Sequence, residues 1–168
     1  MSAAVVTVRA VDYANPRDAA ALVALLDAYA SDPAGGGEPL APAVKAQLPS
    51  ALAQRAGAFS VIAWAQAPDG SEQAVGLVNC FEGFSTFACL PLVNVHDVAV
   101  LPAWRGQRVA QQMLAAVEAT ARARGACKLT LEVLQGNAPA LRTYTREGFV
   151  AYALDPAWGQ AQLMQKLL

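Results

Sequence analysis

The feature that most constrains the fold is a long apolar segment, residues 92–100, that leads through an Arg-Gly turn into an amphipathic helix. A nearly continuous apolar run of this length is typical of a strand in a sheet that is covered on both faces. Apolar residues then recur at helical spacing over residues 107–124, and Gly125 ends that pattern. Residues 128–134 alternate between apolar and polar side chains, as a strand does. A strand, a helix and a second strand in this order predict an α/β sheet with helices packed on it.

The turn between this strand and the helix has the features of an anion-binding site. It consists of Arg105, Gly106, Gln107, Arg108, Val109 and Ala110. The first N–H groups of a helix have no intrahelical partner, so they point toward the space beyond the strand. The helix dipole adds partial positive charge there, and a diphosphate would fit against this loop. The alternative is an ordinary strand-to-helix turn with solvated arginines, since short motifs also occur by chance.

A second motif lies in the helix that we predict over residues 137–147. Asn137 can cap its N-terminus, and Gly148 follows its last residues. Asn137 and Tyr144 are seven residues apart, nearly two full turns, so they share one face of the helix within roughly 20°. This pair indicates either a binding surface or a capped helix with a core tyrosine whose hydroxyl finds a partner at the helix surface.

The two motifs together resemble the signatures of the Gcn5-related N-acetyltransferase (GNAT) family. Residues 105–110 resemble the family's Arg/Gln-x-x-Gly-x-Gly/Ala loop, although Arg108 stands where the family usually has glycine. An arginine at this position must swing aside or itself contact a phosphate. The second signature is matched by Asn137, Ala140, Tyr144, Gly148 and Phe149. The resemblance is strong over residues 93–149 and topological elsewhere.

The resemblance implies an α/β fold, the GNAT fold, in which a mixed and mostly antiparallel sheet is flanked by helices. Residues 3–168 are expected to form a single domain of this type. The expected strands are residues 5–11, 58–66, 74–81, 92–100 and 128–134, with a terminal hairpin of residues 149–154 and 161–168. The expected helices are residues 16–30, 44–55, 107–124 and 137–147.

The resemblance also implies acetyl-CoA as the co-substrate. The strand over residues 92–100 would part from its neighbour, and backbone groups of Val98, Ala99 and Val100 would pair with the pantetheine arm. The residues implied to bind the coenzyme are Val98, Ala99, Val100, Arg105, Gly106, Gln107, Arg108, Val109, Ala110, Asn137, Ala140 and Tyr144. In the family the corresponding tyrosine is proposed to protonate the departing thiolate, so Tyr144 is the expected general acid.

Acetyl transfer to an amine requires a base, because an alkyl amine with a pKa of about 10.4 is mostly protonated at pH 7. His96 is the single histidine of the chain, and Asp97 follows it on a strand where related acetyltransferases place a Glu or Asp. Alternation along the strand sends the two side chains to opposite faces unless a β-bulge intervenes. Both also have a structural interpretation, as a core histidine and a hydrogen-bonded aspartate. Glu132 and Glu82 are the reserve candidates.

Two segments, residues 31–40 and 82–87, are expected to shape the acceptor pocket by analogy with the family. Carboxylate and aromatic side chains there could hold a cationic amine, although solvated loops explain the same residues. The residues expected to contact the acceptor are Glu82, Phe84, Phe87 and Glu132, with Asp32 and Glu38 as further carboxylates.

Composition excludes several other classes of function. The net charge of −1 argues against a nucleic-acid-binding protein. No run of 18 or more apolar residues would span a membrane, and no secretion signal precedes the first strand. Cys80, Cys89 and Cys127 are odd in number and lack metal-ligand spacing, so reduced thiols in the cytoplasm and no bound metal are expected. The oligomeric state is left open, with a homodimer compatible with the sequence.

The expected reaction is direct transfer of an acetyl group from acetyl-CoA to a primary amine in a ternary complex. The acceptor could be a small molecule, a protein N-terminus or a lysine. Two other classes of function stay open. One is a coenzyme A-binding regulatory or interaction domain without turnover, which the arginine at position 108 and the uncertain base favour. The other is an α/β interaction domain that binds no coenzyme.

Overall fold

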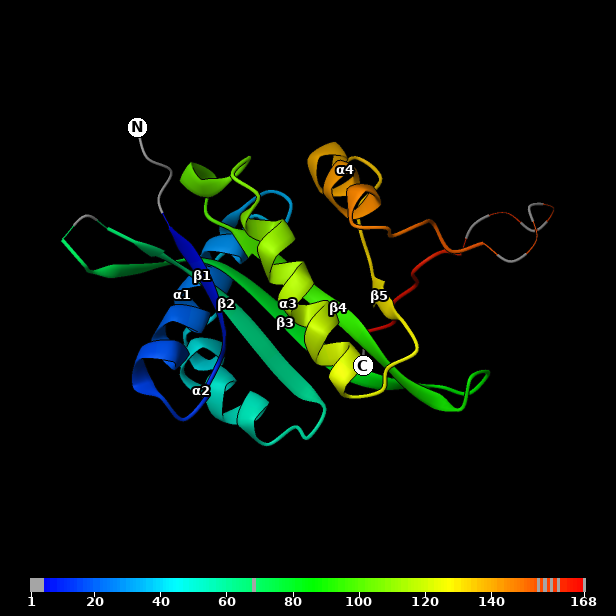
Figure 1. Ribbon diagram of the computed structural model, residues 1–168, viewed down its shortest axis with the longest axis horizontal. Coiled ribbons are helices and arrows are strands. Elements are labelled where there is room, and N and C mark those ends of the chain that lie inside the picture. The colour runs from blue at the N-terminus through cyan, green and yellow to red at the C-terminus, as the bar shows by residue number, and fades with distance from the viewer. Residues whose placement is uncertain are drawn as a thin grey trace. The chain divides into compact units, whose positions relative to one another are not determined.

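The computed structural model describes residues 5–67, 69–153, 155, 157, 159 and 161–167. In chain order the elements are β1 (Val6–Ala10), α1 (Pro16–Ser31), α2 (Pro42–Ala53), β2 (Ala58–Gln66), β3 (Glu72–Ser85), β4 (Leu90–Val100), the short 3₁₀ turn η1 (Pro102–Trp104), α3 (Val109–Ala123), β5 (Leu129–Leu131) and α4 (Ala138–Arg146) (Figure 1). Contacts divide the chain into two compact units, Met1–Leu131 and Glu132–Leu168. The single domain predicted for residues 3–168 stays a prediction.

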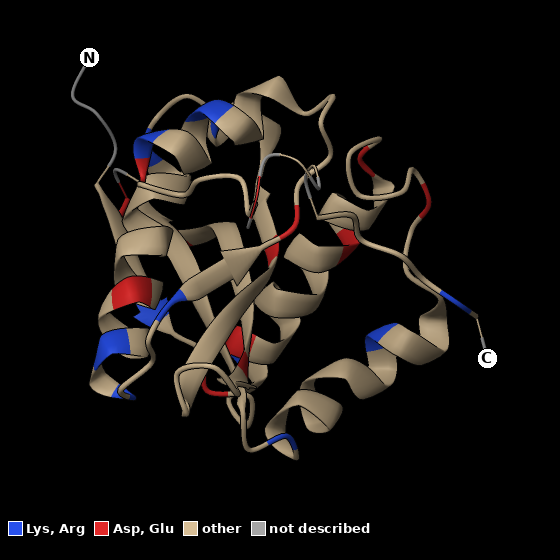
Figure 2. Cartoon of the chain, turned by 90° about the vertical axis from the view of Figure 1, so that its right-hand side faces the viewer, with Lys and Arg blue, Asp and Glu red and all other residues tan. Residues whose placement is uncertain are grey.

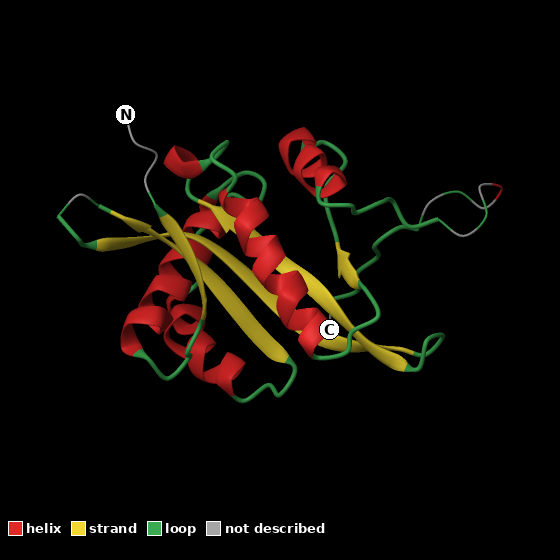
Figure 3. Ribbon diagram, viewed as in Figure 1, coloured by secondary structure: helices red, strands yellow, loops and turns green. Residues whose placement is uncertain are grey.

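The first unit is built around a sheet with strand order β1-β2-β3-β4-β5 (Figure 3). The first four strands pair antiparallel, and β5 pairs parallel to β4. The predicted mixed, mostly antiparallel sheet is therefore confirmed. Because β4 and β5 run parallel, the chain needs a crossover between them, and α3 supplies it.

Helices cover both faces of this sheet. Helices α1 and α2 pack on one face, which we call the α1/α2 face, and α3 packs on the other, the α3 face (Figure 1). The core of the α1/α2 face consists of Leu22, Leu25, Leu52, Ile62, Trp64, Leu77 and Ala99. On the other side α3 buries Val109, Met113, Leu114, Val117 and Ala121. A Cβ at Gly76 would lie 2.8 Å from Met113 Cε, so glycine lets α3 approach the sheet closely.

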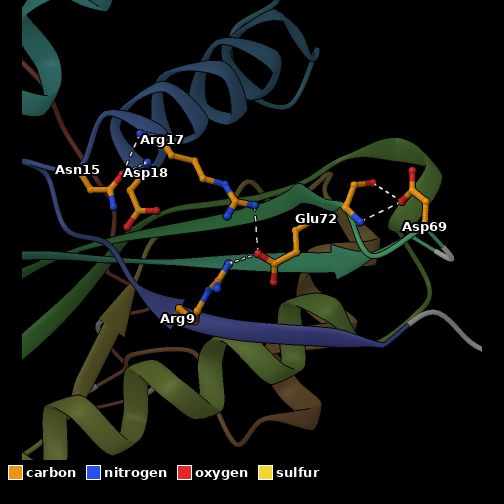
Figure 4. Close-up of polar contacts among 7 residues, drawn as sticks. Arg9, Asn15, Arg17, Asp18, Asp69 and Glu72 are labelled. Carbon is orange, nitrogen blue, oxygen red and sulfur yellow. Dashed lines mark hydrogen bonds and ion pairs between the residues drawn. The ribbon is translucent and has the colours of Figure 1, made fainter.

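The first helix is fixed to the sheet at its N-terminus. Asn15 Oδ1 accepts hydrogen bonds from the first-turn N–H groups of α1, which caps the helix. Figure 4 shows Arg9 of β1 and Arg17 of α1 converging on Glu72 of β3, at N–O distances of 2.9 and 3.0 Å. Both guanidinium groups also lie over the Trp64 ring. These contacts hold α1, β1 and β3 together at one end of the sheet.

The second unit contains α4, whose two ends are both capped. Asn137 Oδ1 accepts from the N–H of Ala140 at the N-terminus. At the C-terminus Gly148 has a φ of +88°, its N–H donates to the Thr145 carbonyl, and the N–H of Phe149 donates to the Tyr144 carbonyl. This hydrogen-bond pair is the Schellman motif, and it explains the Gly-Phe dipeptide that follows the helix.

Several boundaries differ from the sequence-based prediction. β5 covers only residues 129–131 of the predicted 128–134, because its pairing with β4 ends there. β3 is longer than residues 74–81, since β4 continues to pair with it to the end of the hairpin. The terminal hairpin predicted over residues 149–154 and 161–168 forms no strand in its described residues. These residues are exposed except Phe149, which is half-buried, and Leu154 and Leu168 lie outside the described residues.

Blue and red residues are interspersed along the chain in Figure 2, in keeping with a net charge of −1. Among the helices of the described residues, none combines the length and the apolarity that crossing a bilayer requires.

Candidate active site

β4 carries a β-bulge at the position of the two candidate bases. Asn79 of β3 pairs with Asp97, but the next residue, Cys80, pairs with Val95, so His96 is an extra residue in β4. A bulge of this kind changes the side-chain alternation along the strand. The opposite-face arrangement expected from simple alternation is therefore wrong, and the bulge alternative is correct.

The bulge brings His96 and Asp97 to the same face of the sheet. Asn79 Nδ2 donates to Asp97 Oδ2 at 3.0 Å, and the His96 ring lies edge-on to the Phe81 ring with centroids 5.2 Å apart. Asn79 and Phe81 are two residues apart on β3, so their side chains share a face. Leu77, two residues further, belongs to the α1/α2 core. Both candidate bases therefore lie on the α1/α2 face.

Within the described residues of the first unit, no strand pairs with the other edge of β4 beyond Val95, and we call this part the open edge. β5 pairs with Val93, Asn94 and Val95 and ends there. The predicted parting of the two strands around a coenzyme stays a prediction. The N–H of Leu101 donates to a carbonyl of β3, and in an antiparallel ladder alternate residues bond to the same neighbour. The backbone groups of Val98 and Val100 therefore face the open edge.

The backbone of Ala99 has the opposite orientation, because the same alternation directs its amide and carbonyl toward β3. The expectation that Ala99 offers backbone groups to the pantetheine arm is corrected accordingly. Its side chain is buried on the α1/α2 face.

The loop after β4 has an unusual backbone. Gly106 has a φ of +76°, and Arg108, the N-cap residue of α3, has a φ of +61° and a ψ of 20°. Both residues are thus left-handed, a conformation that glycine adopts without a steric penalty. This explains why glycine is usual at the position of Arg108. The following residues, Val109 and Ala110, begin α3, and their N–H groups have no intrahelical acceptor.

Arg105 ties this loop to the C-terminus of α1. Its Nη2 donates to Asp32 Oδ2 at 2.8 Å, and its Nε donates to the Val100 carbonyl at 3.1 Å. The hydrogen bond from Arg105 lowers the pKa of the Asp32 carboxyl below its ordinary value. An ion pair therefore connects the loop that is expected to bind the coenzyme with the expected acceptor segment. Arg105 is held by these two acceptors.

A cavity of about 40 Å³ lies where α1 meets the end of β4. Its lining includes Tyr29, Asp32, Ala99, Val100 and Arg105. Burial, followed by the negative charges of Asp97 and Asp32, raises the pKa of the Tyr29 hydroxyl. The cavity thus has two carboxylates close by. No local signal in the sequence distinguishes Tyr29 from a core residue of its helix.

Three other expected site residues of the first unit lie elsewhere. Glu82 pairs with Val93 on the α3 face and forms an ion pair with Arg124, with N and O 3.3 Å apart. Phe84 and Phe87 lie at the end of the β3–β4 hairpin, where their exposed fractions are 60% and 96%. Phe84 pairs with Pro91, about 20 Å along β4 from Asp97 at about 3.3 Å per residue. None of the three contributes to the cavity.

The remaining site candidates belong to the second unit. Glu132 precedes α4, and Asn137 and Ala140 form the N-terminal cap described above. The Tyr144 ring packs edge-on against Phe149, with centroids 5.9 Å apart. This is the hydrophobic contact that accompanies a Schellman cap. The cap therefore holds the Tyr144 ring as well as the end of the helix.

Comparison with known proteins identifies the family. The family model described as "Acetyltransferase (GNAT) family" matches residues 22–149. A streptothricin acetyltransferase of Streptomyces lavendulae is 38% identical over 65 residues, which are 39% of this chain and 34% of that protein. The matched part is thus about one third of that relative's length.

Solved structures share the fold at low sequence identity. A transcriptional regulator from Bacillus halodurans C-125 aligns with a TM-score of 0.75 and 20% identity, over 96% of this chain and 99% of that chain. An aminoglycoside N-acetyltransferase in complex with CoA aligns with a TM-score of 0.70 and 17% identity, over 99% of this chain and 97% of that one. Because the family model covers more than half of the sequence, the chain belongs to the Acetyltransferase (GNAT) family.

Proposed function

We propose that the protein transfers an acetyl group from acetyl-CoA to a cationic primary amine by direct attack. The observation that carries this proposal is the β-bulge at His96, which places Asp97 on the face of the cavity. Ala99, two residues after Asp97 on the same face, lines that cavity. Family membership supplies the reaction type, and the bulge supplies a carboxylate where the amine would lie.

The chemistry follows from the state of the amine. Asp97 takes a proton from the ammonium group, directly or through one water, and frees the nitrogen lone pair. The nitrogen attacks the acetyl carbonyl carbon, a C–N bond forms, and the C–S bond breaks. The electron pair of that bond leaves on the sulfur, and Tyr144 donates its hydroxyl proton to the thiolate. His96 is the second candidate for the base.

No covalent enzyme intermediate is needed for this reaction. The cysteine nearest to the bulge along the paired strand is Cys80, and burial raises the pKa of its thiol to about 12. It therefore stays protonated and unreactive near neutral pH. Attack by the amine on acetyl-CoA itself is the simpler route.

The coenzyme would bind along the open edge of β4 and the loop that follows it. Backbone groups of Val98 and the N–H of Val100 would pair with the pantetheine arm, as an added strand would, while the Val100 carbonyl accepts from Arg105. The diphosphate would lie on the N–H groups of Gln107 to Ala110, where the left-handed residues and the start of α3 direct donors outward. Asn137 and Ala140 of α4 would add contacts from the second motif. Acetyl-CoA is here a co-substrate, and no metal is proposed.

The acceptor class follows from the charge near the cavity. Asp32 is paired with Arg105, so Asp97 supplies the carboxylate that this pair does not neutralise. Tyr29 supplies an aromatic ring that would contact a cation. Similar proteins act on streptothricin and aminoglycosides according to their names. We therefore favour an acceptor that carries several amino groups. The three free cysteines are the reason to propose a cytoplasmic location.

A thiol-release assay tests the function. Purified protein is mixed with acetyl-CoA and with streptothricin, an aminoglycoside or a peptide with a free N-terminal alanine. We expect turnover with a polycationic amine, a loss of roughly 100-fold in kcat for Asp97→Asn, and a similar loss for Tyr144→Phe in single-turnover experiments. Binding of acetyl-CoA without thiol release from any acceptor would instead assign the chain to the non-catalytic alternative.

A further inference from the structure

A chain of hydrogen-bonded side chains runs across the sheet and ends at Asp97. Tyr13 Oη lies 2.8 Å from Ser60 Oγ. Ser60 Oγ donates to Asn79 Oδ1 at 2.6 Å, and Asn79 Nδ2 donates to Asp97 Oδ2 at 3.0 Å. The four residues come from the segment before α1 and from β2, β3 and β4. They connect the outer part of the sheet with the bulge.

The donors in this chain all point toward Asp97. An ionised carboxylate only accepts, so the amide nitrogen of Asn79 faces Asp97 and its oxygen faces Ser60. The Ser60 hydroxyl donates its one hydrogen to Asn79, so in the bond between Tyr13 and Ser60 the donor is Tyr13. Burial raises the pKa of the Tyr13 hydroxyl, so it stays a neutral donor near pH 7. One consistent direction of donation therefore runs from Tyr13 to Asp97.

The two middle residues of this hydrogen-bond series, Ser60 and Asn79, are buried in an apolar face of the sheet. Ser60 and Asn79 are 2% and 3% exposed, and they are the polar residues that count as buried in the described part of the chain. Ile62 and Leu77, their neighbours two residues along β2 and β3, belong to the hydrophobic core. Apolar side chains would fill these positions without the desolvation penalty of a buried hydroxyl and amide. The polar pair therefore calls for a role other than packing.

We propose that Tyr13, Ser60 and Asn79 are positioning residues for the base, an inference that rests on the proposed acetyl transfer. The hydrogen bond from Asn79 occupies Oδ2 of Asp97 and fixes the plane of the carboxylate on the bulge. Oδ1 is then the atom that receives the proton from the amine. Ser60 and Tyr13 fix the amide of Asn79 in the orientation that this requires.

Matched variants at Ser60 test this role. Val and Thr have nearly the same shape, but only Thr keeps the hydroxyl. With the fastest acceptor of the thiol-release panel, Ser60→Val should lower kcat by roughly tenfold, whereas Ser60→Thr should retain most of it. The KM for acetyl-CoA should stay the same in both. Tyr13→Phe removes only the hydroxyl at the outer end of the hydrogen-bond series, and it should lower kcat by a smaller factor than Ser60→Val.

A double mutant separates positioning from packing. In the Asp97→Asn background, Ser60→Val should have no further effect on kcat, because the group that it positions is gone. Two results would overturn the inference. One is an equal loss of kcat in Ser60→Val and Ser60→Thr, and the other is a Ser60→Val effect on kcat that is just as large in the Asp97→Asn background. If Asp97→Asn lowers kcat but the Ser60 and Tyr13 variants do not, the positioning role fails while the proposed function stands. An unchanged kcat in Asp97→Asn would refute the base itself.

Discussion

At the scale of single residues, the backbone conformation of Arg108 is the unusual feature of the loop after β4. A residue with a Cβ in the left-handed region costs roughly 1–2 kcal/mol, and glycine avoids this penalty. Arg108 adopts that conformation with a φ of +61°. The sequence shows the departure from the family pattern, and the structure shows that the departure keeps the backbone geometry of a glycine.

Arg108→Gly should therefore stabilise the protein. Glycine removes the strain from the folded state but also raises the entropy of the unfolded chain. Because the first effect is larger, we expect the free energy of unfolding to increase by about 0.5–1 kcal/mol. Urea denaturation measures this change. Gln107→Gly is the matched control, because Gln107 does not have a positive φ, and this variant should be less stable than the wild type. A loss of stability in Arg108→Gly would contradict the claim that Arg108 strains the folded state.

The ion pair between Arg105 and Asp32 makes a pH-dependent contribution. The pKa of Asp32 is lowered in the folded state, so its stabilising effect is present above its unfolded pKa of about 3.8 and is lost as the pH falls through the lower folded pKa. The stability difference between wild type and Asp32→Asn should accordingly disappear toward acidic pH. Urea denaturation at a series of pH values checks this. Glu118→Gln, in the exposed pair with Arg122, is the control.

At the scale of elements, helix ends explain much of the second signature. Asn137 caps α4, and Gly148 and Phe149 form the Schellman motif whose apolar contact holds the Tyr144 ring. Part of the motif therefore has a structural reason that applies whether or not the helix contacts a coenzyme. The capping interpretation and the binding interpretation of Asn137 are compatible.

Gly148→Ala should weaken α4. Alanine at a φ of +88° would be strained by about 1 kcal/mol. Hydrogen exchange of the α4 amides should become faster by roughly fivefold, since this change in free energy sets the opening equilibrium. Gly136→Ala is the control, because a Cβ there meets no atom within 4 Å and Gly136 does not have a positive φ. Unchanged exchange in Gly148→Ala would show that the cap contributes little.

At the scale of the whole molecule, acetyl-CoA should stabilise the folded chain by binding to it. A ligand at 100 times its dissociation constant adds about 2.7 kcal/mol to the free energy of unfolding. We expect this gain for the wild type in thermal denaturation, and a dissociation constant at least about tenfold weaker for Gly106→Val, whose side chain would crowd the diphosphate. Val44→Ala, an exposed position on α2, should bind like the wild type. If acetyl-CoA does not stabilise the wild type, the result would favour an interaction domain that binds no coenzyme.

The sequence by itself determined the elements that local chemistry specifies. β2 spans the predicted residues 58–66, and α1, α3 and α4 begin and end within two residues of their predicted bounds. Caps, helical periodicity and an apolar run are signals that need no distant partner. The two motifs were found for the same reason, since each lies within one short segment.

Only the tertiary structure decided which residues share the site. Alternation counted along β4 cannot reveal the extra residue at His96, because a bulge is defined by pairing with β3. The hydrogen bonds from Tyr13 through Ser60 and Asn79, like the pair of Arg105 with Asp32, join residues far apart in the chain. The face on which Asp97 lies depends on strand register, and register is set by the packing of the whole sheet.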